Sequence, residues 1–392
     1  MALITRCELN RATLARQGLL EPFRGVSAES AVQRVGSLQA QHPEWPPIAL
    51  ASRAADGSTA DLAGALDRRQ AARSSLMRIT IHVVAAADLW PMFVVCQPLR
   101  MRQWKLLVKA DPVDSSLGRR LAAAHATAIA ALRERPRSSL ELDRLMSAEA
   151  GVGDEAVTRP AWRQPENQIV VRTAWRHFAA FVPLVHVPHS GEGYGRSLYA
   201  LAEDWLGGRT ELSIEEARVS VARRYLAAFG PATLEDLVAY VARGPGGIGS
   251  WRRALDALAG ELLTLTDEAG RTVFDLEAAP RPPATIDAPP RLLARWDSLL
   301  LSHHPKARDR VLADEHRPLV FSKNADVLPT ILIDGAVSGT WNLERTNADA
   351  CIELRPFGSL AGRDREGLEA EADRVLRLVA PDAGDRRVVF AT

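Results

Sequence analysis

The fold class follows from one segment of the chain, Ser58-Thr59-Ala60-Asp61-Leu62-Ala63-Gly64-Ala65-Leu66-Asp67-Arg68-Arg69, and from the run after it. The segment has a helix cap, an acidic first turn, an apolar stripe and a basic end, which together predict a helix. The run is Leu76-Met77-Arg78-Ile79-Thr80-Ile81-His82-Val83-Val84, whose β-branched residues and partial alternation predict a strand. Helices are also expected at 8–20, from about Ser27 to about Gln39, and at 48–53. Three helices followed by a strand is the element order of a winged helix.

The same order of elements returns twice along the chain. The second set comprises helices at 117–133, from Ser138 and at 167–178, with a strand at 181–187. The third comprises helices at 217–229, from Thr233 and at 251–258, with a hairpin at 262–266 and 272–276. A helix start of the form Ser/Thr-x-x-Asp/Glu-Leu is by itself only a capping motif. Its recurrence in one context, at Ser58–Leu62, more loosely at Ser139–Leu142, and at Thr233–Leu237, indicates tandem modules.

Past a proline-rich linker at 278–290, the pattern changes from helices to strands. Strands are expected at 319–321, 330–333 and 351–354, with a hairpin at Asp334-Gly335 and a closing helix at 365–379. We therefore expect a mainly α chain with small β-hairpins, an α+β fold. Its units are winged-helix modules at 1–115, 116–212 and 213–278, and a C-terminal β-rich region at 279–392.

Length and composition are those of a large globular protein. A chain of 392 residues is too long for one core, and 47% hydrophobic with 25% charged residues is ordinary. The net charge of +1 argues against a polycation but is compatible with a local basic face. Three distant cysteines, Cys7, Cys96 and Cys351, fit neither a disulfide framework nor a zinc site. Because no signal peptide or membrane span is visible, we expect a cytoplasmic protein.

Two glutamines form the strongest candidate site. Gln39 and Gln41 lie in Ser37-Leu38-Gln39-Ala40-Gln41-His42-Pro43-Glu44-Trp45-Pro46-Pro47, between an expected helix and a proline-rich run. At a spacing of two residues, both side chains point to one side of an extended backbone. A glutamine does not titrate or attack, but it presents a carbonyl and an amide at fixed positions. On composition alone, the commoner explanation is two polar side chains that bond to backbone near a helix end.

Familiar catalytic motifs are absent from the sequence. It contains no Gly-rich phosphate loop, no Gly-x-Ser-x-Gly elbow and no His-Glu-x-x-His. The pair His303-His304 has no carboxylate or cysteine at ligand spacing, so we expect a solvated pair and not a metal site.

Several motifs in order resemble the AlkZ family of bacterial DNA glycosylases. They span most of the chain: Leu9–Leu19, Leu38–Gln41, Arg78–His82, Tyr225–Thr233, Trp296–Leu301 and Gly335–Trp341. The resemblance implies tandem winged helices in a C-shaped scaffold that binds double-stranded DNA as a monomer. It also implies a catalytic Gln-aliphatic-Gln motif, which Gln39-Ala40-Gln41 matches. A sister branch resembling YcaQ has Gln-x-Asp instead, so Gln41 places this chain with the branch for self-resistance to alkylating antibiotics such as azinomycin.

The implied chemistry agrees with the residue types. An N7- or N3-alkylated purine already carries a positive charge, so the base is an activated leaving group. Two amide carbonyls could hold the attacking water and face the developing positive charge. No lysine lies near the motif, which predicts a monofunctional glycosylase without a Schiff-base step. We expect no metal or other cofactor, and we expect substrates that include bulky natural-product adducts and interstrand crosslinks.

Further candidates each have a structural alternative. Arg78 and His82 share a face of the expected strand with Thr80, and they either bind DNA or act in the active site, or else brace the first wing. Trp45 could wedge against DNA, although a buried tryptophan between prolines is the commoner arrangement. Basic residues after the first recognition helix either contact phosphates or lie solvated at the surface: Arg68, Arg69 and Arg73. Three more lie in an expected loop or hairpin that could probe DNA: Lys306, Arg308 and Arg310.

A winged-helix protein without catalysis is the rival hypothesis. A transcriptional regulator, or a binder that sequesters a lesion or drug, would need no glutamine pair. Regulators usually read a palindrome as dimers of one small DNA-binding unit, and three modules in a nearly neutral chain fit that poorly. Release of base from alkylated DNA distinguishes the two hypotheses.

Overall fold

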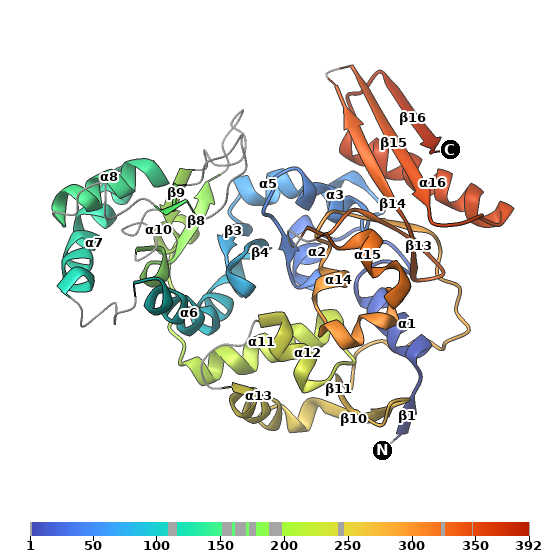
Figure 1. Ribbon diagram of the computed structural model, residues 1–392, viewed down its shortest axis with the longest axis horizontal. Coiled ribbons are helices and arrows are strands. Elements are labelled where there is room, and N and C mark those ends of the chain that lie inside the picture. Colours follow the sequence, from blue (N-terminus) through green and yellow to red (C-terminus); the bar gives the residue numbers. More distant parts are fainter. Residues whose placement is uncertain are drawn as a thin grey trace.

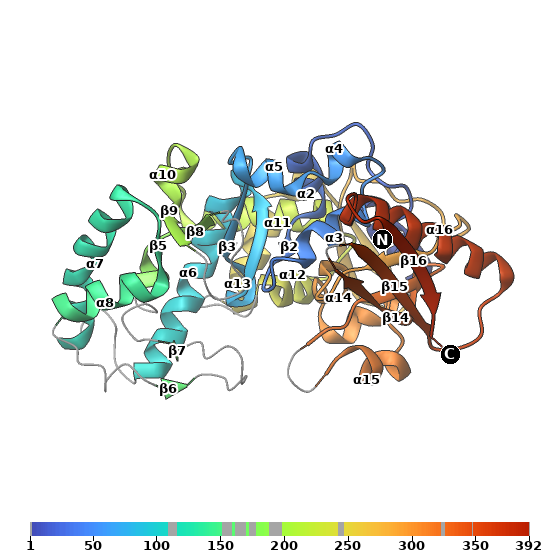
Figure 2. The same cartoon turned by 90° about the horizontal axis from the view of Figure 1, so that it is seen from above.

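Helical groups with small sheets occupy most of the molecule, and a five-stranded sheet lies at one end (Figure 1). The computed structural model describes residues 2–108, 116–150, 159–160, 170–171, 178–187, 198–241, 247–322, 326–346 and 348–391. The fold is mixed α/β. In both views the helices α7 and α8 lie at the opposite end from the C-terminal sheet (Figures 1 and 2). No helix in the described part of the chain is long and apolar enough to cross a membrane.

The first group has the element order of a winged helix. Its elements are α2 (Ala28–Val35), β2 (Leu38–Gln39), α3 (Trp45–Ala51), α4 (Gly57–Ala60), α5 (Leu62–Asp67), β3 (Ala71–Ser75) and β4 (Ile81–Ala85). The helix expected to reach Gln39 ends at Val35, because Gly36 has a φ of +86° and stops it. The strand expected at 76–84 is shorter, because Met77–Ile79 forms a 3-10 turn at the tip of the β3–β4 hairpin.

The second group extends the sheet of the first. It comprises α7 (Ser116–Glu134), β5 (Arg137–Ser138), α8 (Ser139–Glu149), β6 (Arg159–Pro160), β7 (Val170–Val171), β8 (Leu184–Val187), β9 (Leu198–Leu201) and α10 (Ala202–Leu206). Strands of both groups form one sheet in the order β2-β4-β3-β8-β9-β5. Pairing of Arg73 with His186 joins β3 to β8. Of the third helix expected here, at 167–178, the structure describes only Val170, Val171 and Phe178; the prediction is wrong for Val170–Val171, which forms strand β7.

In Figure 1 the third group lies along the lower edge of the molecule, below the first group. Its elements are α11 (Ile214–Phe229), α12 (Leu234–Val241), α13 (Gly247–Asp256), β10 (Leu262–Asp267) and β11 (Thr272–Leu276). The N-terminal strand β1 (Ala2–Ile4) joins this hairpin by pairing in parallel with β10. A long helix that the sequence analysis missed, α6 (Ala86–Val108), packs on α11.

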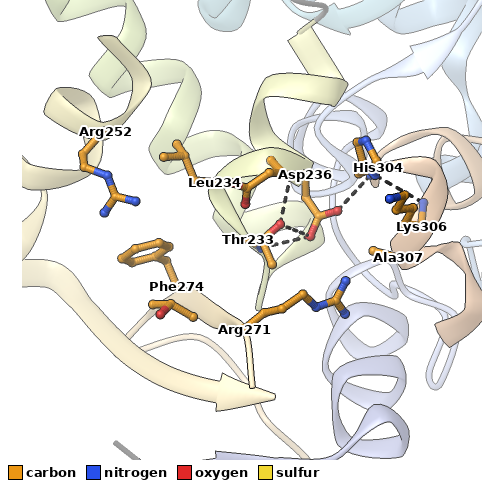
Figure 3. A pocket seen from close by; sticks show the side chains of 11 residues that line it. Thr233, Leu234, Asp236, Arg252, Arg271, Phe274, His304, Lys306 and Ala307 are labelled. Carbon is orange, nitrogen blue, oxygen red and sulfur yellow. Dashed lines mark hydrogen bonds between the residues drawn. The ribbon is translucent and has the colours of Figure 1, made fainter. Parts of the chain in front are cut away.

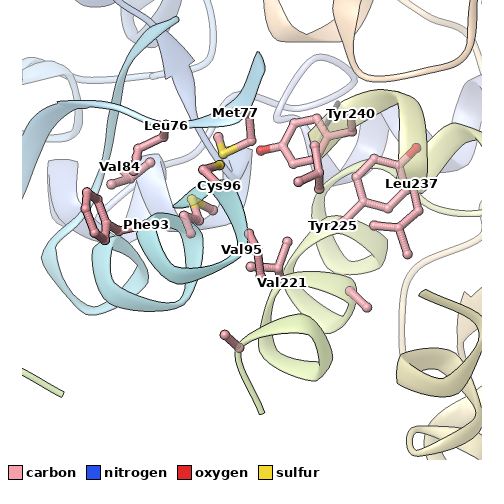
Figure 4. Packing of buried hydrophobic residues seen from close by; sticks show 14 of the residues in the cluster. Leu76, Met77, Val84, Phe93, Val95, Cys96, Val221, Tyr225, Leu237 and Tyr240 are labelled. Carbon is pink, nitrogen blue, oxygen red and sulfur yellow. The ribbon is translucent and has the colours of Figure 1, made fainter. Parts of the chain in front are cut away.

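The hairpin tip of the first group is buried in the core of the third. Leu76 and Met77 are fully buried beside Cys96 of α6 and Tyr240 of α12 (Figure 4). A wing that probes DNA would leave its tip in solvent, whereas this tip is held by packing on several sides. Any side chain at the tip therefore has a fixed position relative to α12.

The C-terminal region is a sheet in the order β12-β13-β14-β15-β16, with a helix packed against it. Its elements are β12 (Arg291–Leu293), α14 (Ser298–Leu301), α15 (Arg317–Val320), β13 (Thr330–Ile333), β14 (Ala336–Arg345), β15 (Asp349–Pro356), α16 (Gly362–Val379) and β16 (Asp385–Phe390). The predicted hairpin at Asp334-Gly335 is confirmed: both residues have positive φ, 47° and 75°, as a tight hairpin turn requires. The strand expected at 319–321 is wrong, since Arg317–Val320 is helical.

Helix α1 (Arg6–Arg16) ties these parts together and is buried around most of its circumference. Arg16 is buried and donates 2.6 and 2.8 Å hydrogen bonds to Asp275 of β11. Asn10 donates 2.9 Å bonds to the carbonyls of Arg310 and Gly335. The motif at 9–19 therefore supplies structural contacts, and the proline-rich 278–290 segment is docked against it through the Arg11 bond to Ile286 O at 2.9 Å.

Candidate active site

Gln39 is the last residue of β2, and Gln41 is the second residue after that strand. Gln39 pairs with His82 of β4, and the Ala40 N–H continues the ladder with a 2.7 Å bond to Ile81 O. The backbone is therefore extended through Gln39 and Ala40, and Gln41 lies in a bend just beyond, so the i, i+2 argument holds only up to Ala40. Both side chains are half-buried. The helix end expected immediately before Gln39 instead lies at Val35.

Each glutamine side chain already accepts a hydrogen bond through its carbonyl oxygen. Gln41 Oε1 accepts a 2.9 Å bond from the Ile81 N–H. Gln39 Oε1 accepts a 3.3 Å bond from Nη2 of Arg78. Across the described residues, neither amide nitrogen has a protein partner. The pair consequently presents N–H donors without a protein partner, and carbonyl oxygens that each already accept one hydrogen bond.

Arg78 lies at the centre of this arrangement. It has a φ of +55° and is followed by Ile79 at +57°, a left-handed pair that costs about 1–3 kcal/mol per residue for side chains other than glycine. Its Nη1 donates a 2.7 Å bond to the Tyr240 carbonyl, and its guanidinium lies 5.7 Å from the Tyr240 ring centroid. Burial lowers the pKa of Arg78 from its ordinary value. The packed hairpin tip thus holds a half-buried cation against Gln39.

His82 is a neutral acceptor in this network. Its side chain is fully buried, and burial together with the adjacent Arg78 lowers its pKa to about 3. Since Nδ1 lies 2.9 Å from the Thr80 carbonyl, that nitrogen carries the proton, and Nε2 accepts from Arg78 at 3.4 Å. A neutral, buried imidazole fits the bracing role that the sequence left open for His82, and it supplies no charge for a phosphate.

Residues far apart in sequence complete the surroundings of the pair. Ser37 Oγ lies 3.0 Å from Tyr240 Oη, and burial raises the pKa of that phenol to about 12. Ser298 donates a 2.7 Å bond to the Ser37 carbonyl. Beside Gln41, the ring of His42 stacks on Trp296 at 5.0 Å, and Trp296 has a φ of +53°. Sequence reasoning assigned none of these a role, although Trp296-Asp297-Ser298 is among the motifs quoted above.

Most of the weaker candidates in the first group make internal contacts. Trp45 is buried and packs edge-on against Trp341 at 6.1 Å, which agrees with the structural alternative. Arg73 donates 3.2 and 3.0 Å bonds to the carbonyl of Ala40, the residue between the glutamines. Arg69 lies 4.5 Å from the Trp205 ring centroid, and Arg68 is largely exposed with an ion pair to Asp61 at 3.2 Å.

The segment expected to be a DNA-probing hairpin is a 3-10 helix, Pro305–Arg310. Arg310 is buried and bonds to the Pro231 carbonyl at 3.0 Å. Arg308 lies over the Phe321 ring at 5.0 Å, and burial with the nearby Arg317 and Arg78 lowers its pKa to about 10. Lys306 is exposed. The solvated pair expected at 303–304 is wrong for His303, which is buried with a pKa lowered to about 3.

Lys306 lines a cleft of about 530 Å³ at the N-terminal end of α12 (Figure 3). Exposed cations from α13 and the β10–β11 turn, Arg252 and Arg271, lie on its other sides, and Phe274 forms part of the wall. The carboxylates of Glu235 and Asp236 also line the cleft. Arg252 lies 5.9 Å from the Phe274 ring centroid. Since Tyr240 lies on the same helix, α12 connects this cationic cleft to the glutamine pair.

Comparisons with known proteins agree with the resemblance drawn from the motifs. A family model described as DNA glycosylase AlkZ-like matches residues 32–378. An interstrand DNA cross-link repair glycosylase of Streptomyces sahachiroi is 30% identical over 242 residues, which are 60% of this chain and 59% of that relative. The solved structure of Streptomyces sahachiroi DNA glycosylase AlkZ superimposes with a TM-score of 0.78 over the whole of both chains, at 21% identity. The chain therefore belongs to the AlkZ-like DNA glycosylase family.

Proposed function

We propose that the protein is a monofunctional DNA glycosylase that hydrolyses the N-glycosidic bond of cationic N7- or N3-alkylated purines. The observation that carries the proposal is the pair of half-buried glutamines. Among the described residues their side-chain N–H groups have no protein partner, and their carbonyl oxygens accept hydrogen bonds from Arg78 and Ile81. The bond to the Ile81 N–H needs only one acceptor, which a single glutamine or a backbone carbonyl could supply, so a structural role does not require two glutamines. The pair is suited to holding polar groups against a substrate.

Two neutral amides are sufficient only for an activated substrate. The C1′–N9 bond breaks with its electron pair going to the base, so a cationic alkylpurine leaves as a neutral molecule. Water adds to C1′ of the oxocarbenium-like sugar and releases one proton to solvent. The products are an abasic site, the free alkylated base and a proton. The sequence has no lysine before Lys105, which supports hydrolysis without a Schiff base.

The scaffold is proposed to consist of three winged-helix modules that bind double-stranded DNA as a monomer. The first and third groups support this, since each has helices followed by a hairpin, and the second has matching helices and strands among its described residues. The cationic cleft lined by Arg252, Arg271 and Lys306 is a proposed contact for the DNA backbone. Arg68 is a second one, because its side chain is largely exposed.

The cellular role is proposed to be self-resistance to an alkylating natural product, with bulky adducts and interstrand crosslinks among the substrates. The name of the Streptomyces sahachiroi relative, an interstrand DNA cross-link repair glycosylase, supports this part. The damaged base would be processed in an open cleft of the DNA-binding scaffold, without being flipped deep into a tight pocket. An open cleft has room for a large substituent.

A base-release assay tests the function. Duplexes with one 7-methylguanine, one 3-methyladenine or no lesion are incubated with the wild type, with Gln39→Ala/Gln41→Ala, and with Gln33→Ala as a half-buried control on α2. We expect release of the methylated bases only, intact abasic strands, and a loss of roughly 100-fold or more in the double variant. An equally active double variant would refute the site. A wild type that binds duplex DNA and releases nothing would establish the non-catalytic alternative.

A further inference from the structure

The hydrogen bonds at the glutamine pair fix which end of each carboxamide faces the substrate. Rotating the Gln41 amide by half a turn would place its NH₂ against the Ile81 N–H, so two donors would meet. The same rotation at Gln39 would place NH₂ against the Arg78 guanidinium, again donor against donor. An arginine and a backbone amide have no acceptor on these nitrogens. The carbonyls are therefore held inward and the N–H groups outward.

We propose, resting on the function proposed above, that Gln39 and Gln41 direct their N–H donors to N3 of a departing N7-alkylated purine, whose single lone pair accepts from one of them at a time; an N3-alkylated purine has no acceptor there, and its release does not use this contact. Arg78 is then a positioning residue, which holds the Gln39 carbonyl so that its N–H points toward the DNA. This reverses the role expected from the sequence, where two carbonyls face the positive charge. The change follows from the carbonyl partners Arg78 and Ile81, both of which lie in the β3–β4 hairpin.

Purine N3 is the acceptor that fits the position of the reaction. It is separated from the glycosidic nitrogen N9 by one carbon atom and lies in the minor groove, where it is accessible without flipping the base. The N7 substituent of an alkylguanine points into the opposite, major groove. Donors that approach from the minor groove therefore reach the reacting nucleotide without meeting even a bulky adduct. A pocket for the adduct is then unnecessary.

The charge that develops during the reaction favours a donor at N3. As the C1′–N9 bond breaks, its electron pair moves to N9 and is delocalised onto N3 of the neutral leaving base. A hydrogen bond from a glutamine N–H to N3 is consequently stronger in the transition state than in the bound substrate, which is the condition for catalysis. Water still supplies the oxygen that bonds to C1′, and its proton is released to solvent.

A pair of substrates isolates the N3 contact. One duplex carries 7-methylguanine and the other carries 7-methyl-3-deazaguanine, which keeps the cationic ring but replaces N3 by C–H. Enzymatic release from each is divided by its spontaneous release rate, so that intrinsic reactivity cancels. We expect the enhancement to fall at least ten-fold on the deaza base for the wild type, and not at all for Gln39→Met/Gln41→Met. Equal wild-type enhancement on both bases would overturn the proposal.

Gln41→Glu distinguishes donors from acceptors at the same site. Its carboxylate still accepts the Ile81 N–H bond but offers no donor to the DNA. We expect release of 7-methylguanine to fall at least ten-fold, whereas a carbonyl-based mechanism requires an equal or faster rate, and that result would refute donor action. If the wild type releases no base from either duplex, the proposed function itself fails, a result separate from both of these.

Arg78→Lys tests the positioning role, because it keeps the positive charge and loses the planar fork that contacts Gln39, His82 and Tyr240 together. We expect a lower rate of release at saturating enzyme, and a ratio between the two substrates that falls toward one. A purely structural role would change the amount of folded protein but not that ratio. If folded Arg78→Lys protein shows the same ratio between the two substrates as the wild type, Arg78 does not position Gln39.

Discussion

The ion pair between Arg53 and Asp297 should be a principal stabilising contact between the first group and the C-terminal region. Their side chains are 0% and 1% exposed, and two hydrogen bonds of 2.9 and 2.7 Å join them. Arg53→Met leaves the Asp297 carboxylate buried without its cation, which costs about 3–5 kcal/mol of unfolding free energy. Because Asp297 follows Trp296, which stacks on His42 beside Gln41, base release should also fail at a lower temperature. Urea denaturation and the temperature dependence of release measure both effects.

A surface pair provides the matched control. Arg68 is largely exposed and pairs with Asp61 at 3.2 Å, so Arg68→Met should change stability by no more than about 1 kcal/mol. Adding Asp297→Asn to Arg53→Met removes the unpaired charge but keeps the Asp297 cap on Leu299, and should restore about 1 kcal/mol or more. If Arg53→Met is as mild as Arg68→Met, the pair does not lock the two regions together.

Three other perturbations test separate parts of the structure. The pKa of His82 is about 3 when folded against 6.5 ordinarily, so below pH 6.5 only the unfolded chain binds this proton. As the pH falls below 6.5, the unfolding free energy of His82→Gln should therefore decrease less steeply than that of the wild type, by about 1.4 kcal/mol per pH unit. Urea denaturation from pH 6.5 to 5 measures this slope. Arg252→Ala with Lys306→Ala should weaken duplex binding and lower its log–log salt slope by about 0.9 for each lost phosphate contact, and an unchanged slope would exclude the cleft from the DNA contact. Gly335→Ala should destabilise by more than about 1 kcal/mol, because φ is +75° and the new Cβ would collide with Asn10 Oδ1. Gly358→Ala places its Cβ in open space and should be near neutral by thermal unfolding.

Local turn and cap chemistry is what the sequence predicts best. The hairpin at Asp334-Gly335 is found because two residues there must adopt positive φ, and this is readable from residue type. The helix starts at Ser138 and Thr233 also follow from local caps, since both side chains bond within three residues. Gly36 gives the same kind of signal for a helix end, but the apolar spacing that continues to Leu38 masked it.

The contacts that define the site are not local, and the sequence therefore could not supply them. In the sequence Arg73 is one of three clustered arginines, and only the fold brings the Ala40 carbonyl, 33 residues away, within 3.0 Å of it. Tyr240 reaches Ser37 across 203 residues. The glutamine pair was found through its match to a family motif, whereas its orientation depends on Arg78 and on a hairpin tip buried by other groups.

Single-turnover release of 7-methylguanine at saturating enzyme tests the central claim, that Gln39 and Gln41 carry the reaction, most directly. Wild type is compared with Gln39→Met/Gln41→Met, which keeps side-chain length and removes the amides, after equal DNA occupancy has been verified by titration. We predict unchanged occupancy with a release rate that falls by roughly 100-fold or more. Equal release rates at equal occupancy would contradict the claim and place the chemistry elsewhere in the chain.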